Sequence, residues 1–139
     1  MTLVVDASVA CKWFISETLS DHAEMLLVNP SARIAPNLIV AEVCNVARAK
    51  LQRGEITPEQ ATIMVDELPG LLDELVPCAQ IAGRALSIAC TLDYPSYDCF
   101  YLALAGARDA RLVTADRKLR TKLATTRWAR LLVGLGEPV

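Results

Sequence analysis

Short apolar runs alternate along the chain with longer segments in which apolar residues recur at helical spacing. The runs predict β-strands over residues 2–5, 33–35, 75–78, 111–114 and 131–133. The periodic segments predict helices over residues 9–14, 18–28, 37–53, 57–68, 81–92, 98–109 and from 116 onward. Strands that alternate with helices are joined by right-handed crossovers, which makes the strands parallel and covers both faces of the sheet. We therefore expect an α/β three-layer sandwich, with a mostly parallel sheet of about four to five strands flanked by helices.

Residues that mark helix ends support these boundaries. Thr57-Pro58-Glu59-Gln60 combines a threonine cap, a proline at the first helical position and a glutamine three residues after the cap, which together form a capping box. Gly54 suits the left-handed backbone that closes many helices, so it predicts the end of helix 37–53. In helix 81–92, the spacing predicts a buried face made of Ala82, Ala85, Leu86 and Ala89.

The composition is that of one globular domain over residues 1–139. Of the 139 residues, 53% are hydrophobic and the net charge is -2, which suits an aliphatic core and excludes disorder. No stretch approaches the roughly 18 apolar residues of a membrane helix, and the first residues lack the basic region of a leader. We therefore expect a cytoplasmic protein with no membrane association. The five cysteines form no C-x-x-C pair, so we expect reduced, buried thiols.

Several catalytic classes are excluded because their signatures are missing. The chain has a single histidine, His22, in a polar segment, and it lacks the motifs of serine hydrolases, P-loop proteins and dinucleotide-binding proteins. The candidate chemistry that remains is that of carboxylates. Asp6 follows the first predicted strand, and Asp116 lies just beyond strand 111–114. Both acids are therefore expected at the carboxyl edge of the sheet, where ligands bind in parallel α/β folds.

Each acidic residue of interest also has a purely structural explanation. Asp6, Asp98 and Asp116 can each cap the helix that follows, because a carboxylate accepts hydrogen bonds from the free amides of a helix start. Glu42 lies among residues that should be buried, where an unpaired carboxylate is costly. The structural alternative for this acid is a solvated stripe that it would share with Asn45, Ala49 and Arg53.

Taken together, these four acids predict a cluster of carboxylates at one edge of the sheet. Like charges that are packed together repel and raise one another's pKa, so a protein that holds such a cluster normally binds cations there. Oxygen ligands without histidine or thiolate favour Mg²⁺ or Mn²⁺ over zinc. Such a site is best suited to phosphoryl hydrolysis, in which two ions roughly 3.5–4 Å apart activate water and stabilise the leaving oxygen.

Four segments stand in an order and spacing that resemble a known family. They are Leu3-Val4-Val5-Asp6-Ala7-Ser8, Glu42 with Asn45, Tyr97 to Ala105, and Thr114-Ala115-Asp116. In this order they resemble the PIN domain, and the whole chain is similar to the VapC-type toxin ribonucleases. The resemblance implies a Mg²⁺- or Mn²⁺-dependent endoribonuclease, the toxin component of a type II toxin–antitoxin system, which cleaves RNA by two-metal phosphodiester hydrolysis. It also implies a cognate antitoxin that blocks the site, and we expect a homodimer.

The resemblance also assigns roles to individual residues. It places the catalytic, metal-binding quartet on Asp6, Glu42, Asp98 and Asp116. Of these, Asp6 and Asp98 are the foremost metal ligands, while Glu42 and Asp116 bind the metal directly or through water, and one of them orients the attacking hydroxide. Residues that would fix the carboxylate rotamers are Ser8, Asn45 and Thr114, each of which can instead be an ordinary cap or a polar surface residue.

The distribution of positive charge bears on RNA binding because the overall sequence pI is only about 5.4. From Arg108 to Arg130 there are eight basic residues against two acids, a local net charge of +6. Phosphate contacts depend on such local cations, although a solvated helix laced with ion pairs would show the same pattern. The residues that we expect to bind RNA are Lys12, Arg117, Lys118 and Arg120.

Two rival functions stay open at the level of the sequence. A phosphomonoester hydrolase with an aspartate nucleophile would need a second carboxylate two residues after Asp6, where this chain has Ser8. A non-catalytic metal- or RNA-binding module with a PIN-like fold would use the same acids as helix caps and hold a structural cation. Loss of RNA cleavage on chelation, with recovery in Mn²⁺, would separate the enzyme from the binding module.

Overall fold

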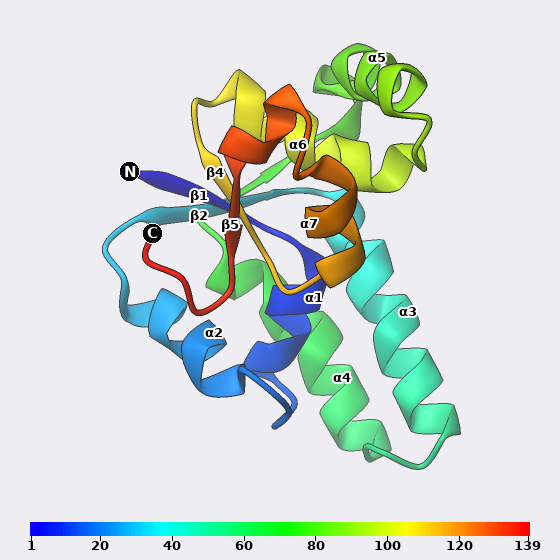
Figure 1. Cartoon of the computed structure of the whole chain (residues 1–139). Helices are drawn as coiled ribbons and strands as arrows, with labels where there is room; N and C mark the ends of the chain where they lie inside the picture. The colour runs from blue at the N-terminus through cyan, green and yellow to red at the C-terminus, as the bar shows by residue number, and fades with distance from the viewer.

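The computed structural model describes residues 1–139, and at its centre lies a five-stranded sheet with the order β3-β2-β1-β4-β5 (Figure 1). All four neighbouring pairs are parallel. The strands are β1 (Thr2–Val5), β2 (Ala32–Pro36), β3 (Glu74–Val76), β4 (Arg111–Thr114) and β5 (Leu132–Gly134). The chain adds β2 and β3 on one side of β1 and then crosses over to add β4 and β5 on the other. The strand order therefore reverses between β1 and β4, the place where open parallel sheets bind ligands.

Helices connect the strands and cover both faces of the sheet. The α-helices are α1 (Ala7–Ala10), α2 (Ser20–Val28), α3 (Leu38–Gln52), α4 (Pro58–Glu67), α5 (Ala82–Leu92), α6 (Ser96–Ala107) and α7 (Arg117–Leu123). The short 3-10 helices are η1 (Cys11–Trp13), η2 (Leu68–Leu71), η3 (Cys78–Gln80) and η4 (Arg127–Leu131). Helices α5 and α6 lie on one side of the sheet, whereas α2, α3 and α4 lie on the other (Figure 1). This arrangement confirms the predicted three-layer α/β fold.

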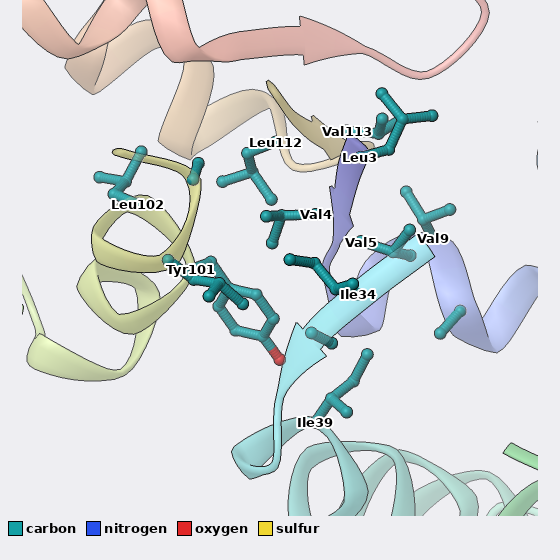
Figure 2. Close-up of a cluster of buried hydrophobic side chains, with 14 of the residues drawn as sticks. Leu3, Val4, Val5, Val9, Ile34, Ile39, Tyr101, Leu102, Leu112 and Val113 are labelled. Atoms are coloured by element: carbon teal, nitrogen blue, oxygen red, sulfur yellow. The ribbon is translucent and has the colours of Figure 1, made fainter. Parts of the chain in front are cut away.

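The core is built where the apolar central strands meet α6. Figure 2 shows Tyr101 and Leu102 of α6 facing Val4, Ile34 and Leu112 of the three central strands, all of them buried. The alternate residues of the strands point to the opposite face and are also buried. Strand segments that are buried on both faces are apolar on both faces, which is why residues 3–5, 34–35 and 112–113 appear in the sequence as short continuous apolar runs. This packing fixes where each strand ends, and so where the acids that follow are placed.

The predicted helix ends at Gly54 and Thr57 are confirmed, whereas the bounds of the third strand differ slightly from the prediction. Both halves of the capping box at Thr57 are formed, and Gly54 has φ +71° after the last residues of α3. The third strand begins one residue earlier than predicted and ends before Pro77, because a 3-10 helix follows it. None of the helices has the length and apolar character needed to cross a membrane.

Two predictions about buried side chains are wrong in part. Of the predicted face of α5, Ala85 is buried and Ala82 and Ala89 are half-buried, whereas Leu86 is 61% exposed. Ile88 and Leu92 are buried instead, which the small alanine side chains did not specify. All five cysteines are free, as predicted, but only two of them, Cys11 and Cys99, are buried.

Candidate active site

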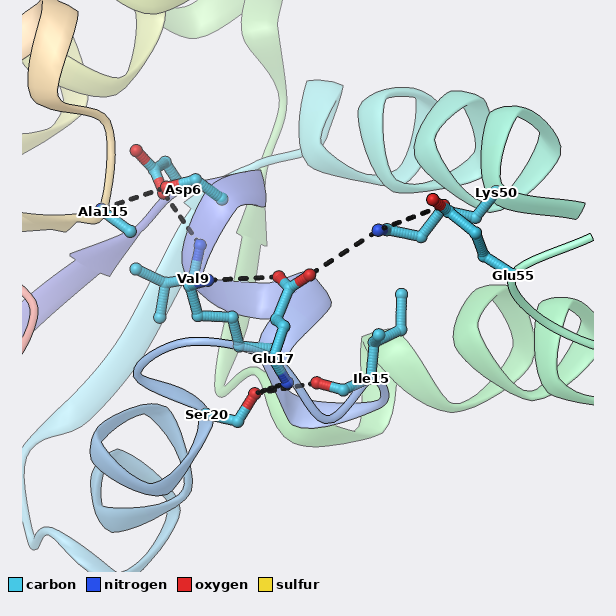
Figure 3. Close-up of polar contacts among 10 residues, drawn as sticks. Asp6, Val9, Ile15, Glu17, Ser20, Lys50, Glu55 and Ala115 are labelled. Atoms are coloured by element: carbon cyan, nitrogen blue, oxygen red, sulfur yellow. Dashed lines mark hydrogen bonds and ion pairs between the residues drawn. The ribbon is translucent and has the colours of Figure 1, made fainter. Parts of the chain in front are cut away.

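Asp6 lies directly after β1 and is held by hydrogen bonds from α1 and from the last residue of β4. Its carboxylate accepts the Ser8 hydroxyl at 2.6 Å and the backbone N–H of Val9 at 3.1 Å on one oxygen, and the Thr114 hydroxyl at 2.5 Å on the other. Figure 3 shows Val9 at the start of α1, with its backbone N–H directed at Asp6. The residue is only 8% exposed. Asp6 therefore caps α1 and is also a fixed, buried carboxylate at the end of the sheet.

Asp116 occupies the equivalent place after β4. One of its oxygens accepts two backbone N–H groups of the first turn of α7, at 2.9 and 3.2 Å. The hydroxyls of Thr114 and Ser8, which both donate to Asp6, also accept from the backbone of this segment. The Asp116 amide donates to the Thr114 hydroxyl at 3.0 Å, and the Ala115 amide donates to the Ser8 hydroxyl at 3.1 Å. Because β1 and β4 are paired in parallel, the two strand-end acids meet at the same edge, as the sequence pattern predicts.

Asp98 and Glu42 reach this edge from helices. Asp98 lies in the first turn of α6, is half-buried, and accepts no hydrogen bond. Glu42 lies in α3, is half-buried, and accepts the Tyr101 hydroxyl of α6 at 2.5 Å. Glu42 shares its face of α3 with the exposed Asn45, as the structural alternative expects. Its carboxylate is nevertheless held by a buried side chain, which a purely solvated stripe does not explain.

Burial and neighbouring carboxylates raise the pKa of two of these acids, Asp6 and Asp98. Burial raises the pKa of Asp6 to about 6, against the opposing effect of its hydrogen bonds, and the charge of Asp116 adds to the rise. Burial also raises the pKa of Asp98 to about 6, with further contributions from Asp116 and Glu42. The pKa of Glu42 is raised by burial and partly restored by its tyrosine hydrogen bond. None of the four acids takes part in any of the six ion pairs of the chain.

The chemistry of this group of acids suits a hard divalent cation. It offers carboxylate and hydroxyl oxygens, and the single histidine of the chain lies elsewhere, beside Gly136. One oxygen each of Asp116 and Glu42 and both oxygens of Asp98 have no hydrogen-bond donor, so they are free to act as ligands. In this structure the side chains do not converge into a group of three or more that could hold an ion. The fit to Mg²⁺ or Mn²⁺ rests on the kind of donor atom, because carboxylate and hydroxyl oxygens are the ligands that these ions prefer.

The expected supporting residues divide into two groups. Ser8 and Thr114 contact Asp6 directly and so restrict its rotamer. Asn45 is exposed and makes no hydrogen bond with any of the acids. Tyr101, which holds Glu42, was not expected from the sequence. The signal for it was present, because a tyrosine inside a helix as apolar as α6 must find a partner for its hydroxyl.

Two of the expected RNA-binding residues are engaged within the chain. The Lys12 ammonium lies 3.1 Å from Glu17, and its side chain is only 12% exposed. Glu17 in turn lies 3.6 Å from Lys50 of α3 (Figure 3). The guanidinium of Arg120 lies 2.8 Å from Glu137 in the C-terminal segment. Neither Lys12 nor Arg120 offers a free cation to a phosphate in this structure.

Arg117 and Lys118, the other two expected residues, differ in this respect. Both are exposed, and neither forms an ion pair. They occupy the first turn of α7, directly after Asp116, so their free charges begin within two residues of the acids. Arg117 and Lys118 therefore place accessible positive charge close to Asp116 and to what we call the acidic edge, the end of the sheet near which the four acids lie.

Comparisons with known sequences match most of the chain to one family. The sequence model of the PIN domain matches residues 3–122. The chain is 30% identical over 124 residues to Ribonuclease VapC3 of Pyrobaculum aerophilum, which covers 88% of this chain and 95% of that protein. It is 33% identical over 118 residues to Ribonuclease VapC1 of Mycobacterium tuberculosis, which covers 84% of this chain and 86% of that protein.

Solved structures show the same fold at lower sequence identity. The crystal structure of PAE2754 from Pyrobaculum aerophilum has a TM-score of 0.73 at 18% identity, covering 98% of this chain and 85% of that one. VapBC2 from Rickettsia felis, bound to a DNA fragment from its promoter, has a TM-score of 0.66 at 15% identity, covering 96% and 98%. Because the PIN domain match covers most of the chain and two relatives reach 30% identity or more, this chain belongs to the PIN domain family.

Proposed function

We propose that this protein is a metal-dependent endoribonuclease, the toxin of a type II toxin–antitoxin pair, which hydrolyses RNA with two divalent cations. The proposal rests on four carboxylates, none of them ion-paired, near the edge where the sheet order reverses. Two of them follow β1 and β4, and the other two approach this edge from α6 and α3. The ribonuclease names of two relatives, at 30% and 33% identity, support the reaction class. Mg²⁺ and Mn²⁺ are the cofactors that an oxygen-only set of ligands favours.

In this proposal the four acids have different tasks. When bound, the ions would lower the pKa of a water ligand and offset the charge that develops on the phosphate. Asp6 and Asp98 would hold the metal, the first as a fixed ligand and the second as a movable one, because only Asp6 of these two is held by hydrogen bonds. Glu42 is held on one oxygen by Tyr101, so its other oxygen could accept a hydrogen bond from the attacking water. Asp116 would bind through its single free oxygen.

We also propose a protein partner that covers this edge. The neighbouring folds include a toxin–antitoxin complex from Klebsiella pneumoniae, with a TM-score of 0.64 at 14% identity over 95% of this chain and 96% of that one. A cognate antitoxin would neutralise the nuclease by occupying the acidic edge. The expected homodimer and cytoplasmic location stay predictions.

Metal chelation tests the proposed reaction. Cleavage of total RNA by the purified protein should disappear in EDTA and return when Mn²⁺ or Mg²⁺ is added in excess, because the carboxylates alone cannot offset the charge of the phosphate. The measurement is the appearance of defined cleavage products on a sequencing gel. Cleavage that persists in EDTA would contradict the metal-dependent mechanism. Binding without cleavage in any metal would favour the non-catalytic module, and hydrolysis of small phosphate monoesters in place of RNA would favour the rival phosphatase.

Replacing Arg117 and Lys118 together by glutamine should weaken RNA binding and flatten its salt dependence. Each phosphate contact that is lost should reduce the slope of log K against log salt by roughly 0.7 for single-stranded RNA. Fluorescence anisotropy in EDTA, where no cleavage occurs, measures both quantities. The matched control replaces Arg53 and Arg108, two arginines whose charges are already paired with glutamates. Equal slopes for the test variant and the parent would mean that the RNA lies on another face.

A further inference from the structure

A hollow of about 300 Å³ lies next to the candidate active site, on the side of α3. One of its lining residues is Glu42, which is also one of the four acids of the candidate active site, the acidic group. Another is Ala7, the residue that follows Asp6. Its walls are mainly apolar and include Leu38 and Val46 of α3. Any group bound in this hollow would therefore lie beside the phosphate at which the activated water would attack in the proposed reaction.

An aromatic ring and a free amide also line this hollow. Tyr97 immediately precedes Asp98 at the start of α6, and its ring is 64% exposed and so accessible to a ligand. Asn45 lies one turn after Glu42 on α3, and its amide has no hydrogen-bond partner in the chain. The hollow thus combines a stacking surface, apolar walls and a group that can both donate and accept hydrogen bonds.

The charge of the hollow indicates what it can bind. It contains a carboxylate and no cation, so a phosphate would be repelled, whereas a flat, neutral ring would not. Bases of single-stranded RNA are recognised by stacking on aromatic side chains and by hydrogen bonds to their edges. We propose that this hollow binds one base of the RNA, next to the scissile phosphate, with Tyr97 stacking on the base and Asn45 contacting its edge.

This inference rests on the proposed ribonuclease function and adds to it a source of sequence preference. It gives Asn45 a role that its position supports, since its amide does not contact the carboxylates. The alternative occupant is an apolar side chain of a protein partner. The affinity of the purified protein for RNA distinguishes these two occupants. If the occupant is an RNA base, this affinity depends on Tyr97; if it is a side chain of a protein partner, it does not.

Substitutions of Tyr97 provide the test. Stacking of one base contributes about 1–3 kcal/mol, so Tyr97→Ala should weaken binding of a short single-stranded RNA in EDTA about 5- to 150-fold. Tyr97→Phe keeps the ring and should bind like the parent. In Mn²⁺, Tyr97→Ala should raise KM by a similar factor and change kcat less. Thermal unfolding should match the parent, because the side chain is mostly exposed. Asn45→Ala should relax the base preference at the same nucleotide.

An RNA that lacks one base shows whether the effect is local. Once the cleavage position is mapped, an abasic nucleotide is placed on either side of it, and binding by the parent is compared with binding by Tyr97→Ala. At one of the two positions the parent and Tyr97→Ala should bind the RNA equally well, because the base that stacks on Tyr97 is missing there. Equal RNA binding by the parent and Tyr97→Ala, with cleavage by the parent intact, would overturn the base-binding inference alone. Absence of metal-dependent cleavage by the parent would instead overturn the proposed function.

Discussion

Asp98→Asn is expected to lower metal-dependent RNA cleavage by more than about 100-fold while the protein stays folded. The loss should exceed the roughly 10- to 100-fold effect of removing an outer partner of a metal ligand, because Asp98 is itself a proposed ligand. Asparagine has nearly the same size, and Asp98 accepts no hydrogen bond that the substitution would break. The measurement is the initial rate of cleavage in saturating Mn²⁺, with circular dichroism to confirm that the fold is retained.

The matched control for this experiment is Asp66→Asn on α4. Asp66 is an exposed acid whose side chain makes no hydrogen bond, so the control removes the same charge from a place outside the acidic edge. Asp6→Asn should abolish cleavage as well, but with a cost in stability, since its carboxylate accepts three hydrogen bonds. If Asp98→Asn cleaved RNA at nearly the parent's rate, Asp98 would not be a metal ligand and the mechanism would need another one.

The positions of Asp6 and Asp116 followed from the sequence because they depend on the local pattern and on one general rule. Each acid follows an apolar run, and parallel strands bring their carboxyl ends to one edge. The structure also shows that helix capping and membership of the acidic group are compatible for these residues. Both acids cap a helix and still belong to the group. The two explanations that the sequence left open therefore describe the same side chains.

Other features depended on contacts between distant parts of the chain, which no local pattern encodes. Arg120 belongs to a basic run, yet Glu137, seventeen residues later, takes up its charge. Tyr101 and Glu42 are 59 residues apart, and they meet only because α3 and α6 converge at the edge of the sheet. The buried face of α5 was misjudged because the alanines that mark it are too small to define a stripe. The sequence thus predicted the placement of the acids better than the surroundings of each one.

Asp98→Asn is also expected to stabilise the metal-free protein at neutral pH. Burial and neighbouring charges raise the pKa of Asp98 to about 6 in the folded state, so the folded protein holds this proton more tightly than the unfolded chain. The stability that this provides is fully present below about pH 4 and is lost as the pH rises through about 6. Above that pH the parent carries an unfavourable charge that the asparagine variant lacks.

The size of this effect can be compared with the loss that opposes it. A rise of this pKa from 3.8 to about 6 corresponds to about 3 kcal/mol, and solvent screening of a half-buried group reduces this to roughly 1.5 kcal/mol. Removing an acid from the first turn of α6 costs roughly 0.5 kcal/mol of helix-dipole stabilisation. The net gain of about 1 kcal/mol should raise Tm by on the order of 3–5 °C at pH 7.5.

Thermal unfolding in EDTA at pH 7.5 and pH 4, and again in saturating Mg²⁺ or Mn²⁺, decides this prediction. At pH 4 the advantage of Asp98→Asn should vanish, because the parent is then protonated at this position. In saturating metal it should vanish or reverse, since an ion that binds only the folded parent adds stability by mass action. Asp66→Asn should show neither dependence. A variant that is less stable than the parent under all of these conditions would place Asp98 in a structural role at the start of α6, and would remove it from the proposed metal site.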